Sequence, residues 1–185
     1  MIINRGGIST FMKNISVRVY YLRLGWFPLT RMFIDGLIVA ILQFKIENIL
    51  EVCGGSGIVS YVMNADESKK HLYKDGVQYG KWRCTSLKGD YDCDKTRFDY
   101  NMEEFSAVDA IRKYQDVDCL YVSWPEKPSD DFMYDVIKHY KEKYVIYVGD
   151  GMGGASASEK FLYYLGQWDS KDICGGEWLY KINRA

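Results

Sequence analysis

The stretch NILEVCGGSGIVSYV, residues 48–62, decides the fold of this chain. It begins with the apolar run ILEV, which indicates a buried strand interrupted by one acidic residue, Glu51. Gly54, Gly55 and Gly57 follow at once, and the apolar residues after them suit the start of a helix. A strand that enters a helix through a glycine turn is typical of α/β proteins. Because glycine has no Cβ, the backbone of such a turn can approach a ligand closely.

Helix and strand patterns alternate along the rest of the chain. Apolar residues at helical spacing alternate with short, near-continuous apolar runs, which are typical of strands buried on both faces. The predicted helices cover residues 30–44, 58–63, 102–115, 129–142 and 159–168. The predicted strands lie at 49–52, within 71–80, at 117–125, within 143–154 and at 177–184. This alternation predicts an α/β fold with a mostly parallel sheet and helices on both faces.

The domain organisation is expected to be simple. No linker or internal repeat divides the chain, so residues 29–185 are predicted to form one domain. Residues 1–28 have strand-like content but no evident partner, and we treat them as an N-terminal extension of unassigned structure.

The composition describes a globular protein. Of its 185 residues, 48% are apolar and 26% are charged, and the formal net charge is −1. No basic excess is present, which argues against nucleic-acid binding. The most apolar stretch, residues 36–44, is too short to cross a bilayer, so we expect no membrane partner.

The cysteines favour a reducing compartment. Their number is 5, which is odd, and they form neither a C-x-x-C pair nor a ligand set with histidine. We therefore expect a cytoplasmic protein without disulfides.

No metal site or nucleophile motif is evident. Asp90, Asp92 and Asp94 have the first spacings of a calcium loop, but Lys95 occupies the position that requires glycine. The sequence has 2 histidines and no G-x-S-x-G motif, so we expect neither a metal centre nor a hydrolase of the serine or cysteine type.

The chemistry of the first turn depends on Glu51. A carboxylate at the end of the strand repels a phosphate but can accept hydrogen bonds from a ligand's ammonium or amide group. The turn also lacks the Lys-Ser/Thr pair of a P-loop. Both observations disfavour a site for nucleotide phosphates.

The segment LEVCGGSGIV resembles the first motif of the class I S-adenosylmethionine-dependent methyltransferases, an acidic residue followed by three alternate glycines. Glu51, Gly55 and Gly57 match that motif, and Cys53 stands where the family has its first glycine. The resemblance implies that S-adenosylmethionine is the cofactor. Glu51 and the turn, which includes Cys53 and Gly54, would hold its methionine part.

Residues 118–154 are similar to a poorly characterised subgroup of methyltransferase-like proteins. In that subgroup a strand ends in a Trp-Pro-Pro-like turn, and the next strand ends in a loop rich in glycine with one acid. Ser123, Trp124 and Pro125 match the turn, and Asp150 matches the acid. The resemblance implies that the first three are the catalytic candidates and that all four residues line the acceptor side of the cofactor site. It also implies that Asp150 is one of the cofactor-binding residues.

The same resemblance implies two further cofactor contacts and the end of the fold. Asp75 would bind the ribose hydroxyls and Asp99 the adenine amino group, although an Asp-Gly turn and a solvated loop explain them equally well. The family fold ends in an antiparallel hairpin, which the strand at 177–184 would supply. The expected fold is therefore a Rossmann-like, three-layer α/β/α sandwich with an antiparallel C-terminal strand.

Three functions follow from these residues. The first is an S-adenosylmethionine-binding protein that transfers a methyl group to an unidentified acceptor. The second is a catalytically inactive binding or structural module with the same fold. The third is an NAD-binding Rossmann protein, which we rank lower because Ser60 stands where its fingerprint requires the last glycine after Gly55 and Gly57.

Overall fold

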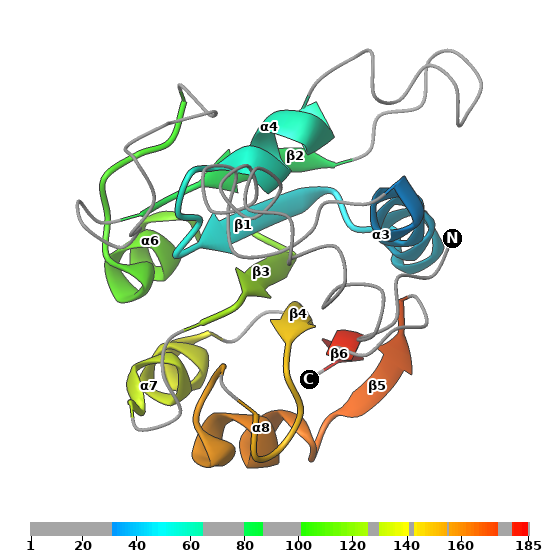
Figure 1. Cartoon of the computed structure of the whole chain (residues 1–185). Coiled ribbons are helices and arrows are strands. Elements are labelled where there is room, and N and C mark those ends of the chain that lie inside the picture. Colours follow the sequence, from blue (N-terminus) through cyan, green and yellow to red (C-terminus); the bar gives the residue numbers. More distant parts are fainter. Residues whose placement is uncertain are drawn as a thin grey trace, which may run out of the picture.

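The computed structural model describes residues 31–64, 80–86, 101–125, 130–140, 143–154, 156–173 and 179–184. These residues build one six-stranded sheet in the order β2-β1-β3-β4-β6-β5 (Figure 1). The strands are β1 (Asn48–Val52), β2 (Lys81–Cys84), β3 (Cys119–Ser123), β4 (Tyr144–Gly149), β5 (Asp169–Asp172) and β6 (Leu179–Arg184).

The sheet is parallel except at its C-terminal part. β1 runs parallel to both β2 and β3, and β3 runs parallel to β4. β6 is antiparallel to β4 on one side and to β5 on the other. The prediction of a mostly parallel sheet with an antiparallel last strand is confirmed.

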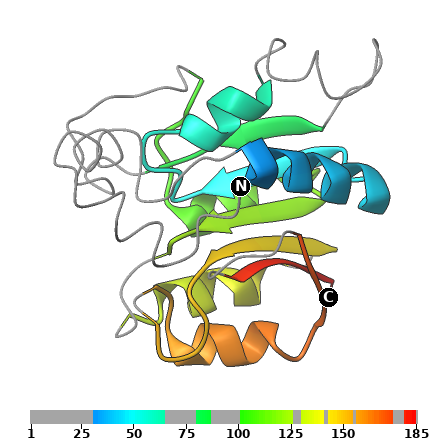
Figure 2. The ribbon, with the colours of Figure 1, turned by 45° about the vertical axis from the view of Figure 1, so that its right-hand side comes forward.

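Helices cover both faces of the sheet (Figures 1 and 2). One face carries α3 (Arg31–Phe44) and α4 (Ile58–Asn64), whose side chains Leu37, Ile38, Val59 and Met63 belong to one buried cluster with the sheet. The other face carries α6 (Ala107–Lys113), α7 (Phe132–His139) and α8 (Glu159–Leu165). The fold is the expected three-layer α/β/α sandwich.

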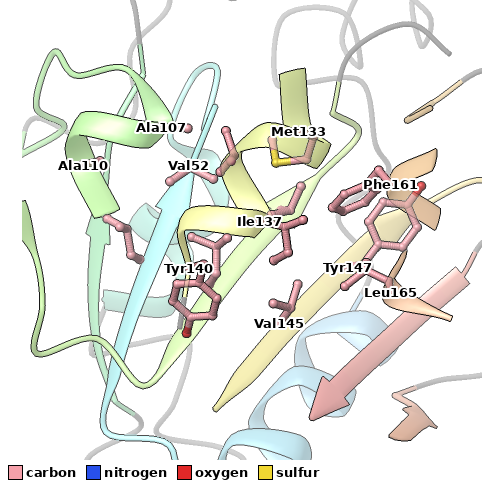
Figure 3. Close-up of a cluster of buried hydrophobic side chains, with 14 of the residues drawn as sticks. Val52, Ala107, Ala110, Met133, Ile137, Tyr140, Val145, Tyr147, Phe161 and Leu165 are labelled. Carbon is pink, nitrogen blue, oxygen red and sulfur yellow. The ribbon is translucent and has the colours of Figure 1, made fainter. Parts of the chain in front are cut away.

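The second face is covered by apolar side chains of α7 and α8 that pack on β4. Figure 3 shows Met133 and Ile137 of α7 and Phe161 of α8 over Val145 and Tyr147 of β4, all in one buried cluster. The rings of Tyr147 and Phe161 meet edge to face, with centroids 5.6 Å apart. Burial by helices on both faces suits the residues of β3 and β4, which include no charged side chain.

Local capping sets where two of these helices begin. The hydroxyl of Ser106 accepts a hydrogen bond from the amide of Asp109 at 3.1 Å, and that of Ser158 from the amide of Phe161 at 3.3 Å. The helix predicted from residue 102 therefore begins only at Ala107.

The second strand begins one residue after the range predicted for it, 71–80. β2 begins at Lys81, and of the predicted residues 71–80 only Gly80 is among the described residues. Residues 1–28 also lie outside them, and the assignment of 29–185 to one domain stays a prediction. Within the described part of the chain, no helix has the length and apolar character that a membrane crossing requires.

Candidate functional site

The carboxyl ends of the four parallel strands meet at one edge of the sheet. The glycine turn follows β1, Thr85 follows β2, Trp124 and Pro125 follow β3, and Asp150 follows β4. In open α/β sheets this edge is where ligands bind. The structure thus brings together, at one edge, all the predicted site residues that it describes.

The turn after β1 has a left-handed backbone. The φ angles are +54° at Cys53, +55° at Gly55 and +72° at Gly57. Glycine adopts this conformation freely, but a residue with a Cβ is strained there by about 1–2 kcal/mol. Cys53 therefore adopts, at a cost in strain, a backbone conformation that glycine would adopt without it.

Gly54 is needed for a different reason, the close contact between the turn and β2. Its amide donates to the carbonyl of Thr85 at 3.1 Å, while the amide of Thr85 donates to the carbonyl of Glu51 at 2.9 Å. A Cβ at Gly54 would lie 2.4 Å from Sγ of Cys84 and 3.3 Å from Cδ of Glu51. The turn therefore rests directly on these two side chains.

Glu51 lies beneath the turn and is oriented by α4. Its side chain is buried, with the residue 3% exposed. Oε2 accepts hydrogen bonds from the amide of Ser60 at 3.0 Å and from the hydroxyl of the same residue. The sequence identified Glu51 as a candidate, but it gave no sign of Ser60 as its partner.

The end of β3 is tied to the end of β4. The amide of Trp124 donates to the carbonyl of Val148 at 2.7 Å, and the carbonyl of Pro125 accepts from the amide of Ala157 at 3.1 Å. The φ of Trp124 is +47°, which is a rare conformation for a bulky residue and one that clusters at functional sites. Ser123, the last residue of β3, is half-buried beside it.

The loop after β4 is held by two side chains that the sequence analysis missed. The hydroxyl of Tyr147 donates to the carbonyl of Asp150 at 2.8 Å, and the amide of Asp150 donates to the hydroxyl of Ser156 at 2.8 Å. Burial raises the pKa of Tyr147 to about 12, so this hydroxyl remains a donor at neutral pH. Gly154 lies so close to Asp150 that a Cβ at position 154 would be 2.1 Å from Cβ of Asp150, so the loop requires glycine there.

The remaining candidates are not placed. Asp75 and Asp99 lie outside the described residues. Among the residues that the structure does describe, no group of 3 or more His, Cys, Asp or Glu side chains could hold a metal ion.

Comparison with known proteins identifies the fold. No protein-family model matches the sequence, and no curated protein matches it either. Among solved structures, an O-methyltransferase from Bacillus cereus in complex with SAH matches with a TM-score of 0.51 and 9% identity, covering 95% of this chain and 89% of that one.

Two further structures match over similar lengths. Cofactor-bound Rv0187 from MTB has a TM-score of 0.53 and 11% identity, covering 98% of this chain and 92% of that one. A Klebsiella pneumoniae protein assigned as an O-methyltransferase has a TM-score of 0.53 and 11% identity, covering 94% of this chain and 88% of that one. The chain therefore has the class I methyltransferase fold.

Proposed function

We propose that this protein binds S-adenosylmethionine at the carboxyl ends of β1 and β2 and transfers its methyl group to an acceptor beside β3 and β4. The observation that carries the proposal is the left-handed turn at Cys53, Gly55 and Gly57, which lies directly over the buried carboxyl of Glu51. Neighbours of the same fold, Rv0187 and the Bacillus cereus enzyme, are solved with cofactor or SAH bound, which supports the choice of ligand.

The residues at this edge fit the amino-acid end of the cofactor. An ammonium group is attracted to the carboxylate of Glu51, whereas the phosphates of a nucleotide are repelled by it. The turn, from Cys53 to Gly57, offers backbone rather than side chains to the ligand. We assign Asp75 to the ribose and Asp99 to the adenine on the family resemblance alone.

The acceptor side is formed by Ser123, Trp124, Pro125 and Asp150. When bound, S-adenosylmethionine supplies a methyl group on a positively charged sulfur, which is ready for attack in line with the bond that breaks. The task of the protein is to hold the acceptor atom on that line, and proximity and orientation account for most of the acceleration. The hydrogen bonds that fix the backbone of Trp124 and Asp150 suit these residues to such positioning.

The subgroup and the location are proposals as well. We place the chain in the poorly characterised methyltransferase-like subgroup because of the Ser-Trp-Pro turn and the loop at Asp150. We propose a cytoplasmic location, since the number of cysteines, 5, is odd and they form no C-x-x-C pair.

Calorimetric titration with S-adenosylmethionine, S-adenosylhomocysteine and NAD tests the proposal. We expect the wild type to bind the first two ligands but not NAD. Gly55→Ala should weaken that binding about tenfold or more, which corresponds to about 1.4 kcal/mol. Gly80→Ala is the matched control, because Gly80 is also left-handed, with a φ of +69°, but precedes β2 at the opposite edge of the sheet.

Each other outcome has a definite meaning. Binding of NAD alone would replace the proposal with the dinucleotide-binding alternative. Binding of none of the three ligands by a folded protein would overturn it and favour an inactive module. Equal weakening by both glycine variants would show that the turn itself is not the site.

A further inference from the structure

Ser60 of α4 meets Glu51 of β1 with two hydrogen-bond donors. Its amide, at 3.0 Å, and its hydroxyl both donate to the same oxygen, Oε2. Ser60 is fully buried, at 0% exposed, and Glu51 is 3% exposed. A carboxylate this deeply buried is stable in its charged form only when donors satisfy it. These two bonds therefore favour a negative charge beneath the turn.

The surroundings leave the carboxyl little freedom. Its carbon Cδ lies 3.3 Å from the place that a Cβ of Gly54 would take, so the turn lies directly over it. The Cα partners of Glu51 in the neighbouring strands are Cys84 in β2 and Tyr121 in β3, and both are buried. No lysine or arginine therefore stands at these flanking positions.

Two donors from one residue anchor one oxygen of the Glu51 carboxylate. The amide bond ties Oε2 to the backbone of α4, and the hydroxyl bond ties the same oxygen to a side chain of that helix. A rotation of the Glu51 side chain would break both bonds at once. The carboxyl is thus held at Oε2 on the side of α4 and lies against the turn at Gly54.

We propose that Ser60 is a positioning residue for the cofactor site, acting through Glu51. By holding Oε2 it aims the negative charge at the space over the turn, where the ammonium of the ligand's amino-acid part would lie. This inference rests on the proposed function, and it makes Ser60 a determinant of how well the protein recognises that ammonium rather than the nucleoside part.

The test compares two ligands that differ in this part. S-adenosylhomocysteine carries the amino-acid group, and 5′-methylthioadenosine lacks it. Ser60→Ala removes the hydroxyl but keeps the amide, so we expect the affinity for S-adenosylhomocysteine to fall about tenfold. The affinity for 5′-methylthioadenosine should be unchanged. Ser60→Thr keeps a hydroxyl and should retain the wild-type difference in affinity between S-adenosylhomocysteine and 5′-methylthioadenosine.

A double-mutant cycle identifies Glu51 as the intermediary. Glu51→Gln should reduce the affinity for S-adenosylhomocysteine and not that for 5′-methylthioadenosine. In that background Ser60→Ala should have little further effect, because the charge that it orients is gone. Additive losses would mean that Ser60 acts independently of Glu51, which would overturn the inference.

Controls separate positioning from stability. Ser158→Ala removes another buried serine hydroxyl, the N-cap of α8, and should affect neither ligand. Should Ser60→Ala fail to fold, Ser60→Cys replaces it, because its thiol is a weaker donor of similar size. An equal loss of affinity for both ligands would show that Ser60 only stabilises the fold, which would overturn the inference. A folded wild type that binds neither ligand would overturn the proposed function, and this inference with it.

Discussion

The hydroxyl of Ser156 accepts a hydrogen bond from the amide of Asp150 at 2.8 Å, across a loop whose intervening residues include 3 glycines. The carbonyl of Asp150 is bound as well, by the hydroxyl of Tyr147. Both backbone groups of this acidic residue are therefore fixed by side chains. A loop rich in glycine, which would otherwise be free to sample many conformations, is thus held in place at its acidic residue.

Ser156→Ala should reduce stability by about 1 kcal/mol, the usual net worth of one hydrogen bond. The reason is that the amide of Asp150 loses the acceptor that the loop provides. Urea unfolding measures the change. Ser170→Ala, at an exposed position of β5, is the control and should stay within about 0.5 kcal/mol of the wild type. Equal midpoints for all three proteins would contradict this role of Ser156.

Tyr147 makes stability depend on pH in the alkaline range. Burial raises its pKa in the folded protein to about 12, whereas an unfolded tyrosine titrates near 10.0. Because the folded pKa is the higher one, the stabilisation is complete below about pH 10 and is lost as pH rises towards 12. Tyr147→Phe should therefore flatten the fall in unfolding free energy in this window. A slope identical to that of the wild type would contradict the prediction.

Cys53 offers a test of backbone strain. At a φ of +54°, glycine is relaxed and a residue with a Cβ is not. Cys53→Gly should therefore be more stable than Cys53→Ala by about 0.5–1 kcal/mol, the strain being partly offset by the chain entropy of glycine. Comparison of these two variants cancels the loss of the thiol. Thermal unfolding measures the difference in stability between the two variants. A more stable Cys53→Ala would show that the backbone at Cys53 is not strained.

Gly54 and Cys84 should behave as a coupled pair. Gly54→Ala places a Cβ 2.4 Å from Sγ of Cys84, and such overpacking costs about 1–3 kcal/mol. Cys84→Ala removes the sulfur, so the double variant should recover much of that loss. Denaturant unfolding of the four proteins gives the coupling energy. If the losses of unfolding free energy in the two single variants simply add, the turn does not pack against Cys84.

The sequence predicts the central layer well because its strands are unambiguous. The residues of β3 and β4 are nearly all apolar, since helices cover both faces. β2 is harder to predict, because Lys81–Cys84 is short and only Trp82 and Cys84 of its residues are deeply buried. The limits of a strand of this kind depend on its neighbour β1 rather than on its own residues.

The turn of the candidate site is predictable because glycines at close spacing have few structural uses. Ser60 and Ser156 are not, because serine is common and their importance lies in bonds to Glu51 and Asp150. Cys53 looks like a departure from the motif in the sequence, yet its backbone adopts the left-handed conformation. A residue other than glycine at this position of the motif therefore does not exclude the left-handed backbone.

The position of β6 between β4 and β5 has a consequence for the order of events during synthesis. β5 precedes β6 in the chain, but β6 provides the ladder that joins β5 to the rest of the sheet. While the ribosome has reached only β5, the edge of β4 is open and able to pair with another nascent chain. The edge of β4 therefore stays unpaired until residues 179–184 emerge, and in this interval it is open to pairing with a strand of another chain.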